Sequence, residues 1–107
     1  MKTLSLIATT ALLAANTAFA APSTLKFDVY NADDNSFNVN STVVYGDTEA
    51  MVVDAGFTKA DALRIAAKVM DSGKELKTIF ISQADPDYYF GAEVLHELFP
   101  KAQIITT

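Results

Sequence analysis

The chain has 107 residues, a formal net charge of −5 and no cysteine. This acidic balance argues against nucleic acid or anionic lipid as a partner, because long-range attraction to either needs clustered positive charge. The lack of cysteine excludes a disulfide scaffold, a thiolate metal site and a cysteine nucleophile, while a hydrophobic content of 50% argues against disorder.

The first 20 residues have the features of a signal peptide. Lys2 is followed by an apolar run from Leu4 to Ala15, and Ala18-Phe19-Ala20 matches the small-x-small pattern that signal peptidase cleaves. The run is shorter than the roughly 20 apolar residues that span a bilayer, and a buried N-terminal helix is the alternative. We expect cleavage after Ala20 and a periplasmic or secreted domain of residues 21–107, without membrane contact. That domain has 107 − 20 = 87 residues and a net charge of 7 − 13 = −6.

Three strands are predicted in the first half of this domain. Leu25–Tyr30 alternates apolar and polar side chains, as a strand with one buried face requires, and Asn31–Asn35 follows as a polar turn. Phe37–Tyr45 is a second strand-forming run. Gly46-Asp47 favours a tight hairpin that leads into a third strand at Ala50–Val53. We expect these strands to form a meander.

A helix and a buried strand are predicted next. Thr58 and Asp61 have the spacing of a capping box, and Gly73 supplies a C-terminal stop. The apolar residues expected on one helical face are Ala62, Leu63, Ala66, Val69 and Met70. The short β-branched run Thr78–Ser82 predicts a buried strand, and a polar loop begins at Gln83.

The last elements are a helix over Gly91–Phe99, ended by Pro100, and a strand beginning in Gln103–Thr107. The chain shows no internal repeat and no interdomain linker. The expected fold is therefore a single α/β unit with the order β-β-β-α-β-α-β.

The loop after the fourth predicted strand is the main candidate site. It contains Gln83, Asp85, Asp87, Tyr88 and Tyr89, and ligands in open α/β folds gather at the carboxyl ends of strands. The alternative is structural, because Asp-Pro-Asp is also a turn that begins a helix, with Asp87 as its cap.

This segment resembles the signature of the metallo-β-lactamase superfamily, in which a buried strand leads into Ser/Thr-H-x-H-x-D-H and a glycine-bearing helix start. In that register Gln83 and Asp85 stand at the first and second His, Asp87 matches the Asp, and Tyr88 stands at the third His. The upstream Val52-Val53-Asp54-Ala55-Gly56 is similar to the D-x-G that ends a strand in this fold. The resemblance covers residues 25–107.

The resemblance implies half of an αββα sandwich and a zinc-dependent hydrolase. Asp85 and Asp87 are then the metal-ligand positions, and Asp87 is the nearest candidate for a catalytic residue. Gln83 offers only a weak amide ligand, and the Tyr88 phenol must first lose a proton with an ordinary pKa of about 10. Asp54 either orients the loop behind the metal ligands or simply ends its strand.

The later metal ligands of the family would come from segments beyond Thr107. We therefore expect a truncated N-terminal part that is inactive alone, with the missing C-terminal half or a second copy as partner. The alternative is a metal-independent periplasmic binding module that uses the loop from Gln83 to Tyr89 to bind a small molecule. A third hypothesis is a fragment without independent function. The substrate is not defined by the fold.

The remaining polar and aromatic residues favour structural roles. His96 has no second His to pair with and is expected on a helix surface. Ser82 has no neighbouring base in the sequence that would make it a nucleophile. Tyr88 and Tyr89 are candidates for lining a pocket. For Tyr89 and Phe90 the alternative is packing in the core, where aromatic residues at a helix start are often found.

Overall fold

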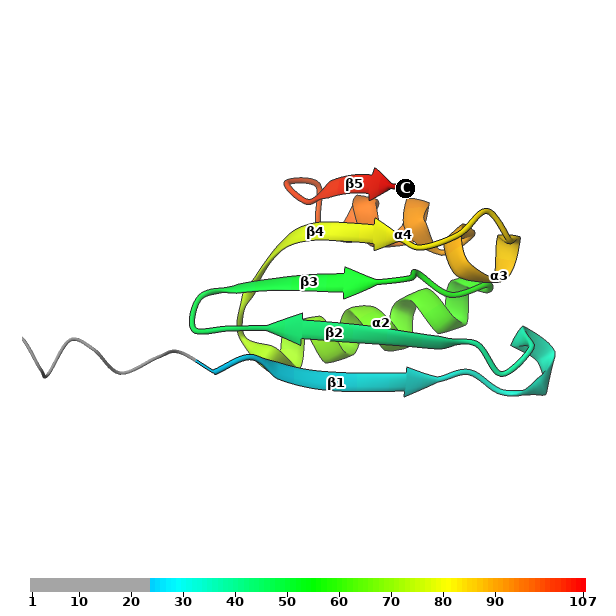
Figure 1. Cartoon of the computed structure of the whole chain (residues 1–107), viewed down its shortest axis with the longest axis horizontal. Coiled ribbons are helices and arrows are strands. Elements are labelled where there is room, and N and C mark those ends of the chain that lie inside the picture. The colour runs from blue at the N-terminus through cyan, green and yellow to red at the C-terminus, as the bar shows by residue number, and fades with distance from the viewer. Residues whose placement is uncertain (1–23) are drawn as a thin grey trace, which may run out of the picture.

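The computed structural model describes residues 24–107, so the expected signal peptide lies outside the described residues. These residues form a five-stranded sheet with the helices on one face (Figure 1). The elements in chain order are β1 (Lys26–Asn31), η1 (Asp34–Ser36), β2 (Asn40–Tyr45), β3 (Glu49–Val53), α2 (Lys59–Ser72), β4 (Glu75–Ile81), α3 (Pro86–Tyr89), α4 (Ala92–Leu98) and β5 (Gln103–Thr106). The expected α/β class and the order of the main elements are confirmed. No helix within residues 24–107 is long and apolar enough to cross a membrane.

The strands lie in chain order across the sheet, β1-β2-β3-β4-β5. β1, β2 and β3 pair antiparallel, which confirms the meander, whereas β3–β4 and β4–β5 pair in parallel. Parallel neighbours end at the same edge of a sheet. The loops that follow β3 and β4 therefore meet at one edge, where the candidate site lies.

Helix α2 covers the centre of the sheet. Its capping box forms as predicted between Thr58 and Asp61, and Gly73 ends it at a left-handed φ of 69°. Ile65 is fully buried against the sheet, but Leu63 and Met70, predicted on the buried face, are 45% and 57% exposed. The prediction was wrong for these two because the buried stripe runs through residues 61, 62, 65, 66 and 69, which leaves positions 63 and 70 on its flank.

The alternation of β1 was predicted correctly, but its buried face was assigned wrongly. Phe27 and Val29 are 67% and 48% exposed, because they lie on the face opposite α2. The polar positions face the helix instead: the Asp28 carboxylate pairs with Lys68 Nζ at 2.8 Å, and the Tyr30 hydroxyl donates to Asp61.

The face opposite the helices is apolar across all five strands. Cross-strand partners share a face of a sheet, and the register aligns Phe27 with Val44 and Val53 with Phe80. We call this surface the open sheet face; its apolar residues are Phe27, Val29, Val44, Met51, Val53, Phe80 and Ile105. No described element packs against it (Figure 1).

Some predicted bounds are corrected. β2 begins at Asn40 and not at Phe37, because Phe37 and Asn38 both have a left-handed φ of 56° that an extended strand cannot contain. β4 already begins at Glu75 and ends before Ser82. The final helix is shorter than predicted, and a separate turn of helix, α3, precedes it.

Candidate functional site

The site is built on two loops that are joined through their backbones. The turn of residues 54–56 follows β3, and the loop of residues 82–91 follows β4. The Ala55 N–H donates to the Tyr88 carbonyl at 2.8 Å, and the Gly91 N–H donates to the Gly56 carbonyl at 3.0 Å. These bonds fix the second loop against the first.

Asp54 holds the start of the second loop. Its carboxylate accepts hydrogen bonds from the Ser82 backbone N–H and the Ser82 hydroxyl, both at 2.8 Å. Asp54 is 6% exposed and has a φ of 65°, so it also turns the chain out of β3. The structure therefore shows Asp54 at the end of its strand with its carboxylate bonded to Ser82, whereas its role behind metal ligands stays a prediction. The Ser82 hydroxyl donates to the Asp54 carboxylate, a partner that lies 28 residues away in the sequence and was not predicted.

Gly91 is required by the close approach of the two loops. A Cβ atom at this position would lie 2.1 Å from the Ala55 carbonyl oxygen. Gly91 is also the N-cap residue of α4. The predicted cap, Asp87, lies instead in the first turn of α3, whose own N-cap, Asp85, makes no side-chain capping bond. Asp-Pro-Asp does begin a helix, as the structural alternative predicted, but its N-cap is Asp85, so the prediction of Asp87 as the cap was wrong.

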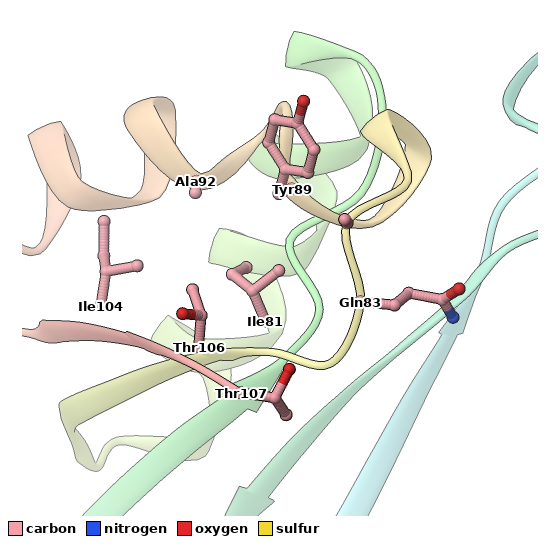
Figure 2. Close-up of a pocket in the computed structure, with 8 residues that line it drawn as sticks. Ile81, Gln83, Tyr89, Ala92, Ile104, Thr106 and Thr107 are labelled. Carbon is pink, nitrogen blue, oxygen red and sulfur yellow. The ribbon is translucent and has the colours of Figure 1, made fainter.

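The residues predicted to form one site are divided between two hollows. Gln83 and Tyr89 line a hollow of about 360 Å³ between the end of β4, α4 and β5. Figure 2 shows Ile81, Ala92 and Ile104 around this hollow, while the Gln83 side chain points away from Ala92 and Ile104. Tyr88 lines neither hollow and contributes its backbone carbonyl.

The two carboxylates line the second hollow, which has a volume of about 370 Å³. We call it the aromatic hollow; its lining residues are Phe37, Phe57, Asp85, Pro86, Asp87 and Phe90. The ring centroids of Phe37 and Phe57 are 5.5 Å apart, and those of Phe57 and Phe90 are 5.6 Å apart. Tyr89 extends the array with an edge contact on Phe90 at 5.2 Å.

Sequence reasoning missed two of these rings. Phe37 was placed in a strand, and Phe57 was not singled out at all. Phe57 follows the Asp-Ala-Gly turn directly, and this proximity was the available signal. Phe90 and Tyr89 are 53% and 38% exposed, so they line hollows and are not core residues.

A buried carboxylate anchors the loop that carries Phe37. Asp61 is 3% exposed and accepts hydrogen bonds from the Tyr30 hydroxyl at 2.7 Å, the Ser36 hydroxyl at 2.5 Å and the Thr58 N–H at 3.1 Å. Burial alone would raise the pKa of Asp61, but the bonds from Ser36, Tyr30 and Thr58 together outweigh it and lower the pKa to about 2. Burial, followed by the bond to the Asp61 carboxylate, raises the pKa of Tyr30.

Potential metal ligands are sparse in the part of the chain that the structure describes. Residues 24–107 contain no group of three His, Cys, Asp or Glu side chains placed to hold a metal ion. Asp85 and Asp87 lie in the aromatic hollow, and the Asp54 carboxylate is occupied by Ser82. His96 is exposed in the last turn of α4, as predicted.

A mixed sheet with helices on one face, a strand-end Asp-x-Gly turn and a loop after the next strand define an α/β domain of the metallo-β-lactamase type. Residues 34–107 match the family model described as the metallo-β-lactamase superfamily. The chain belongs to this superfamily, whose members are typically zinc-dependent.

The comparison with solved structures supports the same fold. The chain is similar to the DIM-1 metallo-β-lactamase, in a crystal exposed to ceftazidime, with a TM-score of 0.59 and 16% sequence identity. The match covers 81% of this chain and 43% of that one, so the chain spans less than half the length of that enzyme. A search of curated protein sequences gave no match.

Proposed function

We propose that this chain is an exported member of the superfamily that binds a small molecule at the carboxyl end of its sheet without a zinc centre and without hydrolytic activity of its own. The observation that carries the proposal is the aromatic hollow. It combines partly exposed aromatic rings with two carboxylates, and its volume of about 370 Å³ lies in the range of small-molecule sites, about 300–1,000 Å³.

The donor set supports a metal-independent function. Catalytic zinc sites use three protein ligands, mostly imidazoles and carboxylates, and leave one position open. Here Gln83 lines one hollow with its side chain directed away from Ala92 and Ile104, and Asp85 and Asp87 line a different hollow. The only imidazole of the chain, His96, is on the exposed surface of α4. The side chains that are present therefore do not fit a zinc ion.

The proposed ligand surface is narrower than the loop predicted from the sequence. The expected binding module used all polar and aromatic side chains from Gln83 to Tyr89. We now assign the ligand to Asp85, Asp87 and the three rings, because these side chains line one hollow.

A second candidate function is the N-terminal half of a zinc hydrolase completed by a C-terminal half. Its support is the open sheet face, together with the match to 43% of the DIM-1 chain. In that case the missing half would supply both the cover for this face and the remaining ligands. This candidate predicts hydrolysis only in the presence of a second polypeptide.

Ligand-observed NMR with a library of ring-containing fragments tests the proposal. Binding that is unchanged by a chelator, and lost in Phe57→Ala, supports metal-independent recognition in the aromatic hollow. Binding that requires added zinc, or zinc-dependent hydrolysis of a chromogenic ester by the chain alone, would contradict it. Export is tested separately by mass spectrometry of the periplasmic fraction, where we expect the N-terminus at Ala21.

A further inference from the structure

The charge of the aromatic hollow is one-sided. Asp85 and Asp87 are the only ionisable side chains that line it, and neither takes part in an ion pair with another described residue. Residue 85 is exposed and residue 87 is partly buried. The hollow therefore attracts cations and repels anions.

The rings of the hollow present the complementary chemistry. Phe37 is 67% exposed and Phe90 53% exposed, and Phe57 lies between them, stacked on Phe90 and tilted against Phe37. All three rings line the hollow, so a ligand can contact their exposed parts. The face of an aromatic ring carries a partial negative charge that attracts an ammonium group within about 6 Å of its centroid. The rings also offer apolar contact to the hydrocarbon part of a ligand.

The exposed ring of Phe37 is held in place by its loop. Phe37 and the following Asn38 both have a φ of 56°, a conformation that costs free energy for an aromatic residue. The preceding turn η1 is fixed by the Asn35 N–H, which donates to the Asp33 carboxylate at 3.0 Å, and by the bond from Ser36 to Asp61. The left-handed backbone ends η1, because Phe37 is the C-cap residue of this turn and its N–H donates to the Asp34 carbonyl. The same turn leaves the Phe37 ring at the edge of the hollow, where a ligand can contact it without rearrangement of the loop.

The geometry points to an organic cation as the ligand: a substituted ammonium group that carries one aromatic ring or a short alkyl body. The ammonium lies between the carboxylates of Asp85 and Asp87, and the body rests on Phe37, Phe57 and Phe90. This inference rests on the proposed function, because it names the class of ligand for the same hollow.

The test compares three probes that share a benzyl or phenyl ring and differ in charge: benzyltrimethylammonium, benzyl alcohol and benzenesulfonate. Each is titrated into the ¹⁵N-labelled chain, and the amide shifts of residues 37, 57 and 90 report binding. We expect the cation to bind about fivefold or more tightly than the alcohol, which is about 1 kcal/mol, and the sulfonate to give no saturable shift. Added salt should weaken the binding of the cation but not that of the alcohol.

Variants separate charge from ring contact. The double substitution Asp85→Asn and Asp87→Asn should reduce the affinity for benzyltrimethylammonium to that of benzyl alcohol and leave the alcohol unchanged. Asp71→Asn, which removes an exposed carboxylate from α2, should change neither. Phe37→Ala should weaken both probes, since both use the ring.

The outcomes distinguish this inference from the proposed function. If the alcohol or the sulfonate binds the hollow as tightly as the cation, the ligand class is wrong and metal-independent binding stands. If the double variant keeps the full preference for the cation, the assigned carboxylates are wrong. If none of the probes and no neutral fragment binds, both proposals are overturned.

Discussion

Asp61 is the residue whose substitution tests the structural account most stringently. Its buried carboxylate joins β1, η1 and α2 through hydrogen bonds from Tyr30, Ser36 and Thr58. Asp61→Asn keeps the size of the side chain and, with a suitable amide orientation, most of these bonds, but it removes the charge that strengthens them. We expect Asp61→Asn to be less stable than the parent chain at neutral pH and less sensitive to acid.

The size of this effect follows from the pKa of Asp61, which is lowered from the ordinary value of 3.8 to about 2. At about 1.36 kcal/mol per pKa unit, the ionised carboxylate contributes about 2 kcal/mol to the free energy of unfolding. Because the folded-state pKa is the lower one, this contribution is fully present above about pH 5. It is lost progressively as the pH falls from about 5 to about 1, mostly between the two pKa values.

Urea unfolding followed by circular dichroism measures both parts of the prediction. The parent chain should lose about 2 kcal/mol more than Asp61→Asn between about pH 6 and about pH 2. Asp71→Asn, on the exposed side of the same helix, serves as the control and should follow the parent chain. Equal acid sensitivity of the parent and Asp61→Asn, or equal stability at neutral pH, would refute the reasoning.

Three further substitutions test the loops and the open sheet face. Gly91→Ala places a Cβ 2.1 Å from the Ala55 carbonyl oxygen and should lower the free energy of unfolding by about 3 kcal/mol. The control Gly46→Ala, whose Cβ would lie 3.6 Å from its nearest atom, should change the free energy of unfolding little. Similar thermal melting midpoints for the two variants would disprove the loop contact. Asp54→Ala should cost about 1–3 kcal/mol in urea unfolding, since it leaves a backbone N–H without its partner, and Asp54→Asn should cost less, because Asn tolerates positive φ. The parent chain should associate through its open sheet face as its concentration rises, because an exposed apolar patch of this kind favours contact between copies. In sedimentation velocity, Phe27→Lys, on that face, should reduce this association, whereas Leu63→Lys, on α2, should not. A parent chain that stays monomeric at all concentrations would contradict this prediction.

Local chemistry made most of the fold predictable. The Thr58 and Asp61 capping box and the left-handed Gly73 bound α2 as expected, because both signals act within one turn of helix. The face of β1 was not predictable from alternation. Alternation shows that a strand has an apolar side, but it does not show whether that side meets the helices. Phe27 and Val29 lie on the side that no described element covers.

The candidate site was predicted only in part. The position after the fourth predicted strand identified the loop with Asp85 and Asp87, and the family resemblance identified the turn with Asp54. In the structure both segments directly follow strands that end at the same edge. Neither signal identified Phe37, which reaches the hollow from a different loop. That contact depends on the left-handed backbone at residues 37 and 38 and on the bond from Ser36 to Asp61, and neither has a local sequence signal.

Zinc content tests the central claim most directly. The purified chain is incubated with zinc, desalted and analysed for metal, and the same sample is melted with detection by circular dichroism. We predict far less than one zinc ion per chain and a cooperative melt whose midpoint zinc does not change. About one zinc ion per chain together with a raised midpoint would show that the side chains do assemble a metal site, and it would contradict metal-independent binding.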